Sequence, residues 1–141
     1  MPDKPLWTCP HCGHRFVTTN LWHSCGVQTL GEHFDGKQPH VAETFEAIVD
    51  AAKACGPLEV YAQKSRILLQ NRVRFASVIT RKRHLILGLW LTHKVEHPRL
   101  TRYEPVGNGI HYPYFQIGDA GEIDQPLRDW IREAYVHGAS R

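Results

Sequence analysis

Apolar residues in the middle of this chain recur at the spacing of a helix. From Pro39 onward they stand three or four positions apart, and Gly56-Pro57 ends the pattern. The apolar face of this predicted helix consists of Val41, Phe45, Ile48, Val49, Ala52 and Cys55. A second helix is expected after Asp124, an N-capping residue type, with Gly138 as its C-terminal cap. Its predicted inward face consists of Leu127, Trp130, Ile131, Ala134 and Tyr135.

Between the two helices, the pattern changes to alternation and to short apolar runs, which are typical of strands. The predicted strands are 58–62, 66–70, 72–80, 84–92 and 110–117. Pro113 places the last of them at an edge or a bulge. Since short links favour antiparallel pairing, we expect an α+β domain with a mostly antiparallel sheet of about five strands and helices on one face. A mixed sheet is the main alternative.

The segment before these elements contains metal-binding chemistry. Cys9 and Cys12 are two thiols separated by two residues, and His23 and Cys25 follow at a short distance. Thiolate and imidazole are ligands that zinc prefers. We therefore predict one structural zinc ion per chain, bound by Cys9, Cys12, His23 and Cys25, with His33 as the alternative fourth ligand. Four neighbouring ligands favour a closed structural site over an open catalytic one.

Two other interpretations of these cysteines are ordinary reduced thiols and a redox-active pair. A redox pair opens a helix, and the residues after Cys12 are a poor helix start. The zinc interpretation divides the chain into a zinc-finger-like module, residues 1–35, and an α+β domain, residues 39–141. The joint between them is the turn-forming segment 35–39.

Composition agrees with a folded domain. The chain has 141 residues, of which 42% are hydrophobic and 22% are charged. It contains no apolar run of membrane-spanning length, and its first residues do not resemble a secretory signal. We therefore expect a cytoplasmic protein without membrane association, in which cysteines serve as metal ligands or buried thiols rather than disulfides.

The formal net charge is only +3, but its distribution is uneven. No acidic residue occurs between Glu59 and Glu96. That stretch holds eight of the seventeen Lys and Arg residues: Lys64, Arg66, Arg72, Arg74, Arg81, Lys82, Arg83 and Lys94. A field of one sign favours an anionic partner such as a nucleic acid or a nucleotide. The alternative is a solvated sheet face that keeps strand edges soluble.

Several of these residues alternate along predicted strands and so share a sheet face. Tyr112 and Tyr114 would add stacking surfaces beside them, since basic residues hold a nucleic-acid backbone while aromatic rings stack on its bases. The candidate ligand-binding residues are Lys64, Arg66, Arg72, Arg74, Trp90, Arg99 and His111.

The sequence also resembles a known family. Residues 7–16 with Asn20 and 23–25 are similar to the N-terminal zinc element that precedes a domain of unknown function, number 5655, in some bacterial proteins. The looser similarity of the remainder rests on 64–67, 73–76 and 130–135. The resemblance implies a link to DNA-associated functions, because related domains occur at the ends of larger proteins of that kind. It carries over no catalytic residue.

Three functions remain open at this stage. The first is a module that binds nucleic acid or another phosphate-bearing anion through a basic sheet face. The second is a zinc-stapled adaptor domain for protein interactions, and the third is an enzyme that uses Lys64, Arg66 or His111. The strand region lacks the converging carboxylates of a metal nuclease, and no nucleophile elbow occurs, so we expect binding rather than catalysis.

Overall fold

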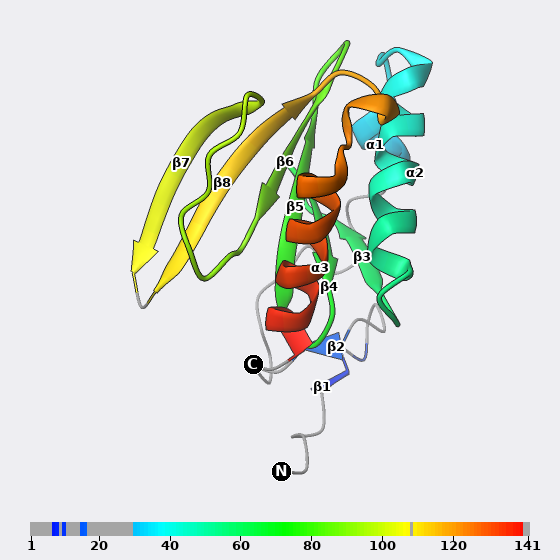
Figure 1. Cartoon of the computed structure of the whole chain (residues 1–141). Coiled ribbons are helices and arrows are strands. Elements are labelled where there is room, and N and C mark those ends of the chain that lie inside the picture. The colour runs from blue at the N-terminus through cyan, green and yellow to red at the C-terminus, as the bar shows by residue number, and fades with distance from the viewer. Residues whose placement is uncertain (1–6, 9, 11–14, 17–29, 108, 140–141) are drawn as a thin grey trace.

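The computed structural model describes residues 7–8, 10, 15–16, 30–107 and 109–139 (Figure 1). Near the N-terminus, β1 (Trp7–Thr8) and β2 (Arg15–Phe16) form a two-stranded antiparallel pair. The remaining elements are, in order, α1 (Leu30–Phe34), α2 (Pro39–Lys53), β3 (Glu59–Ala62), β4 (Ile67–Gln70), β5 (Arg74–Thr80), β6 (Leu85–Leu89), β7 (Leu100–Gly107), β8 (Ile110–Ile117), η1 (Ala120–Glu122) and α3 (Gln125–Ala139).

The main sheet has six strands in the order β3-β4-β5-β6-β8-β7, and each neighbouring pair is antiparallel. The predicted α+β class and antiparallel sheet are therefore confirmed. The alternative, a mixed sheet with some parallel pairs, is excluded for these six strands. Short turns join β3 to β4, β4 to β5 and β5 to β6, as local antiparallel pairing requires.

The strand count was underestimated because β7 lacks the apolar alternation of a half-buried strand. It contains Arg102, Glu104 and Pro105, and its register with β8 is broken by two irregularities. Strand β7 lies at the edge of the sheet, where polar side chains and Pro are tolerated because one side of the backbone needs no partner. Pairing with β8, rather than periodicity, makes this segment a strand.

Of the two alternatives predicted for Pro113, an edge strand or a bulge, the edge is excluded, because β8 lies between β6 and β7. The expected irregularity is present in another form. The pairing of β8 with β6 stops at Tyr114, opposite Gly88, and resumes only at an isolated bridge between His111 and Leu91. Pro113 falls in that gap of the ladder, opposite Leu89 in the unchanged register, where it has no N–H to donate to β6.

The two long helices cover the same face of the sheet, as predicted (Figure 1). Phe45, Ile48 and Ile131 are buried in one core with the inward residues of the strands. Trp130 is half-buried and its ring stacks on Phe115, with 5.6 Å between ring centroids. Burying one apolar stripe of each helix on the sheet is the main source of stability for such a layered domain.

The N-terminal end of α3 agrees with the sequence prediction, and its C-terminal end does not. Asp124 caps the helix, since its Oδ1 accepts a hydrogen bond of 3.1 Å from the backbone N–H of Leu127. Gly138, by contrast, is not a C-terminal cap but lies within α3. A Cβ atom there would stand 3.2 Å from the Phe75 side chain and from the Val73 carbonyl, so this glycine lets α3 approach β5 closely.

In the described part of the chain, no helix combines the length and apolar character needed to cross a membrane.

Candidate functional site

The predicted zinc ligands Cys9, Cys12, His23 and Cys25 lie outside the described residues. Around the first two, β1 and β2 pair with Thr8 opposite Arg15. Among the described residues, no group of three His, Cys, Asp or Glu side chains is arranged to hold a metal ion. The alternative ligand, His33, is buried on α1, and its Nε2 lies 2.7 Å from the carbonyl oxygen of Gln63. This contact anchors α1 to the turn between β3 and β4.

The sheet topology gathers many of the basic residues at one end of the sheet. The β3–β4 turn, the β5–β6 turn and the segment before β7 all lie there, because Ala62 pairs with Ile67, Thr80 with Leu85, and Leu85 with Ile117. We call this end, with its six cationic side chains, the basic end: Lys64, Arg66, Arg81, Lys82, Arg83 and Arg99. Lys64 and the three consecutive residues of the β5–β6 turn are exposed.

The other four candidate residues lie toward the opposite end. Arg72 is in the β4–β5 turn, and Arg74 begins β5. Trp90 follows β6, and His111 is near the start of β8. The structure therefore does not bring His111 together with Lys64 or Arg66, which the enzyme hypothesis grouped as alternatives. The side chain of His111 forms a hydrogen bond with the Tyr103 hydroxyl, across the β7–β8 pair.

Arg74 is held within the molecule rather than presented to solvent. Its Nε donates a hydrogen bond to the Tyr61 hydroxyl, and its guanidinium carbon lies 5.5 Å from the centre of that ring. Burial raises the pKa of Tyr61 to about 12, although the positive charge of Arg74 opposes this shift. The phenol thus stays neutral, and it fixes Arg74 in place, so Arg74 is poorly suited to grip a mobile ligand.

The aromatic residues expected to stack on bases are packed against one another. Tyr112 and Tyr114 are only 5% and 6% exposed, and their rings stack with centroids 4.5 Å apart. Trp90 meets the Tyr112 ring edge-on at 4.4 Å. The Tyr112 hydroxyl is hydrogen-bonded to Ser77, and burial raises the pKa of Tyr112 despite that bond. Of these rings, only half-buried Trp90 keeps a substantial exposed surface.

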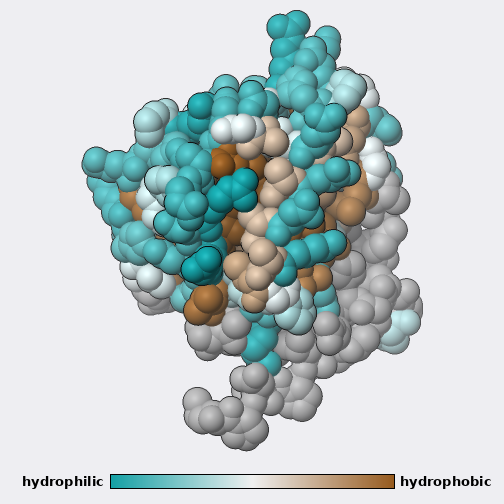
Figure 2. Space-filling model, turned by 45° about the vertical axis from the view of Figure 1, so that its right-hand side comes forward, coloured by the Kyte–Doolittle hydropathy of each residue, from teal (hydrophilic) through white to brown (hydrophobic). Residues whose placement is uncertain are grey.

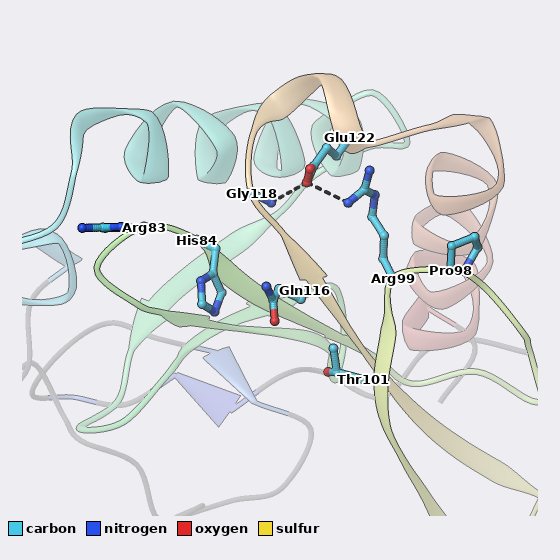
Figure 3. A pocket seen from close by; sticks show the side chains of 8 residues that line it. All are labelled: Arg83, His84, Pro98, Arg99, Thr101, Gln116, Gly118 and Glu122. Atoms are coloured by element: carbon cyan, nitrogen blue, oxygen red, sulfur yellow. Dashed lines mark hydrogen bonds and ion pairs between the residues drawn. The ribbon is translucent and has the colours of Figure 1, made fainter.

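A pocket of about 530 Å³ opens at the basic end (Figure 3). It lies between the β5–β6 turn, the start of β7 and the segment that follows β8. Its lining residues are Arg83, His84, Pro98, Arg99, Thr101, Gln116, Gly118 and Glu122. Most of these present polar groups, so the pocket suits a hydrated, charged ligand better than an apolar one.

One side of the pocket is fixed by Glu122. Its Oε1 accepts hydrogen bonds of 2.8 Å from both Arg99 Nη1 and the backbone N–H of Gly118 (Figure 3). These bonds hold the Arg99 guanidinium over the pocket and neutralise part of its charge. Among the described lining residues, Glu122 is the only one with a carboxylate.

The other side of the pocket is lined by polar side chains without described partners. Within the described part of the chain, the side chains of Arg83, His84 and Gln116 make no hydrogen bond or ion pair. Among the described lining residues, two guanidinium groups stand against one carboxylate. Guanidinium groups bind phosphate and carboxylate oxygens through paired N–H donors, so the site is equipped for a small anion or a phosphate group.

The sequence had indicated Arg99 but not its neighbours. Arg83 was visible only as part of a basic turn, and His84 only as the start of a strand. Gln116 and Glu122 carried no signal, because their place beside Arg99 depends on the pairing of β8 with β7, and β7 was not predicted.

These observations define a compact α+β domain with one six-stranded antiparallel sheet, two covering helices and a basic end. A family model described as a domain of unknown function, DUF5655, matches residues 30–137, so the chain belongs to this family. No curated protein and no solved structure matches the chain.

Proposed function

We propose that the protein binds a phosphate-bearing anion, with single-stranded nucleic acid as the main expected ligand, at the basic end of the sheet. The observation that carries this proposal is the pocket at that end, which is lined by the anchored Arg99 and by Arg83 and His84, whose side chains have no described partner. Exposed Lys64 and Lys82 extend the positive surface beyond the pocket. A phosphate in the pocket and further phosphates along the turns would then be held by charge.

The proposed surface differs from the sheet face expected from the sequence. On that face, Arg74 is engaged by Tyr61, and the rings of Tyr112 and Tyr114 are buried. A phosphate-bearing ligand needs cationic side chains that it can reach. The turns of the basic end supply such side chains and leave them exposed.

The test is a low-salt binding titration with labelled single-stranded DNA and RNA, alongside nucleotides and inorganic phosphate as competitors. The variant is Lys82→Glu with Arg83→Glu, which reverses two exposed charges of the basic end. The matched control is Arg128→Glu with Arg132→Glu, which makes the same charge change at exposed positions of α3. We expect the first variant to bind at least about tenfold more weakly, since each lost phosphate contact costs on the order of 1 kcal/mol. Absence of binding below the millimolar range, or equal losses in both variants, would contradict the proposal.

We also propose that the N-terminal segment holds one structural zinc ion through Cys9, Cys12, His23 and Cys25. The antiparallel pairing of Thr8 with Arg15 supports this, because the two paired strands flank the first cysteine pair in the sequence. Buried His33 already contacts the Gln63 carbonyl through its Nε2, so we favour His23 as the fourth ligand. Reduced thiolates are needed, so we place the protein in the cytoplasm.

Elemental analysis of protein purified without chelator should find one zinc per chain. The Cys12→Ser variant should contain less zinc per chain. The α+β domain should keep its thermal transition in that variant, since its core is built from residues within 30–139. Cys55→Ser is the matched control, because that thiol lies at the end of α2 and donates to the Ala51 carbonyl. Zinc-free wild-type protein would disprove the site.

A further inference from the structure

We infer that the groove between α2 and α3 is a docking site for an acidic peptide segment of a partner protein. The groove lies on the helix-bearing side of the molecule, apart from the basic end, and shares no lining residue with the pocket there. Figure 2 looks onto this side and shows apolar surface exposed between rows of hydrophilic side chains.

The groove has a volume of about 410 Å³. Its α2 wall consists of the small residues Ala51, Ala54 and Cys55, and its α3 wall contains Tyr135 and Val136. Val136 is 58% exposed, so it presents an apolar side chain to solvent at this wall. An occupant of this groove would need an apolar side chain to cover Val136 and the alanines.

The polar groups of the groove floor already have hydrogen-bond partners within the protein. The Tyr135 hydroxyl donates a hydrogen bond of 2.7 Å to the Pro57 carbonyl, and the Cys55 thiol contacts the Ala51 carbonyl at 3.6 Å. The Gln125 amide donates to Asp129 at 2.8 Å. The floor therefore offers shape and apolar surface rather than hydrogen bonds, so it suits a side chain and not a nucleotide base.

The charge of the groove is of one sign. Arg128 and Arg132 are both exposed, and in the described part of the chain their guanidinium groups form no ion pair or hydrogen bond. None of the described residues that line the groove carries a carboxylate. One helical turn separates the two arginines, or about 6 Å along the axis. Two carboxylates at similar spacing, flanking an apolar residue, would complement this wall, as in one face of an acidic amphipathic segment.

The experiment selects binders from a displayed library of random peptides, with the full-length protein as bait. We expect selected peptides to combine Asp or Glu with an apolar anchor. Synthetic versions should bind Arg128→Glu/Arg132→Glu at least about tenfold more weakly, which is the loss of roughly one strong charged contact. Val136→Ser should also weaken binding, while Lys82→Glu/Arg83→Glu, the matched charge change at the basic end, should not.

Three outcomes would overturn the inference. The first is that no specific peptide is enriched. The second is that the enriched peptides lack acidic residues or bind the Arg128/Arg132 variant equally well. The third is a dimer in sedimentation that the same variant dissociates, because the groove would then be covered by a second copy. All variants are checked by circular dichroism, and the substituted positions are exposed, so folding should be retained.

Discussion

At the scale of single residues, Gly88 is the described glycine with the least room for a side chain. It lies in β6 opposite Ser77 on one side and Tyr114 on the other. A Cβ atom built there would stand 2.3 Å from a ring carbon of Tyr112 and 2.8 Å from the Ser77 hydroxyl oxygen. The missing side chain is what lets the Tyr112 ring lie over the sheet and place its hydroxyl on Ser77.

We therefore predict that Gly88→Ala lowers the free energy of unfolding by about 2 kcal/mol, the cost of overpacking a filled site. Urea unfolding of the two proteins measures the difference. Gly36→Ala serves as control, because Gly36 has a φ of +73° but nothing within 4 Å of its added Cβ. It should cost only about 1 kcal/mol of backbone strain. Equal costs at both positions would show that crowding around Tyr112 is not the reason for the glycine.

Arg74 shows the limit of sequence analysis at this scale. Its position on an alternating strand was correctly predicted, and that position suggested a ligand contact. Whether the side chain faces solvent or a neighbouring tyrosine depends on the pairing of β4 with β3 and with β5, which periodicity does not report. Charge reversal at Arg74 should accordingly destabilise the protein, whereas reversal at exposed Arg83 should not.

At the scale of elements, the helices were the most predictable parts. Their apolar spacing and the cap at Asp124 are local properties, and α2 and α3 formed almost where expected. Strand β7 was missed because its sequence alone does not favour a strand, and it forms only by pairing with β8. The pocket at the basic end was unpredictable for the same reason, since β7 delivers Arg99 and Thr101 to it.

Two histidine contacts fasten the segment between β6 and β7 to α3. His97 Nε2 lies 2.8 Å from Asp124 Oδ2, and His93 Nε2 lies 2.6 Å from Glu133 Oε2. The hydrogen bond to Glu133 raises the pKa of His93 above its ordinary value of 6.5. Desolvation alone would raise the pKa of Asp124, but hydrogen bonds from His97 and from the Leu127 backbone lower it below 3.8.

These directions predict how stability depends on pH. A raised pKa of His93 means that its contribution is complete below pH 6.5 and is lost as pH rises through the raised value. The unfolding free energy at pH 5.5–6 should therefore exceed that at pH 8–9 by about 0.5 kcal/mol from this exposed pair. The lowered pKa of Asp124 makes stability depend on pH in the opposite direction. The contribution of Asp124 to the unfolding free energy is present at neutral pH and is lost as pH falls below 3.8.

Glu133→Gln is the variant that isolates the His93 contribution. Urea unfolding at the two pH values should show a smaller difference in this variant than in the wild type. Glu46→Gln, an exposed change on α2, should leave the difference unaltered. An unchanged pH dependence in Glu133→Gln would mean that the pair contributes nothing to stability.

At the scale of the whole molecule, one end of the sheet and the helix-bearing side have different chemistry. The turns at one end bring together cationic side chains from three segments of the chain. The helix side instead exposes an apolar groove with two arginines. The uneven charge was visible in the sequence, but its concentration at one end follows from the strand order, which no local pattern encodes.

The central claim is that the basic end binds phosphate groups, and the salt dependence of binding tests it most directly. The logarithm of the association constant for single-stranded DNA should fall linearly with the logarithm of salt concentration, by about 0.7 for each phosphate contact. In Lys82→Glu/Arg83→Glu the slope should be shallower by about one unit or more, whereas Arg128→Glu/Arg132→Glu should keep the wild-type slope. A wild-type slope near zero, or one that the Lys82/Arg83 variant leaves unchanged, would contradict the account.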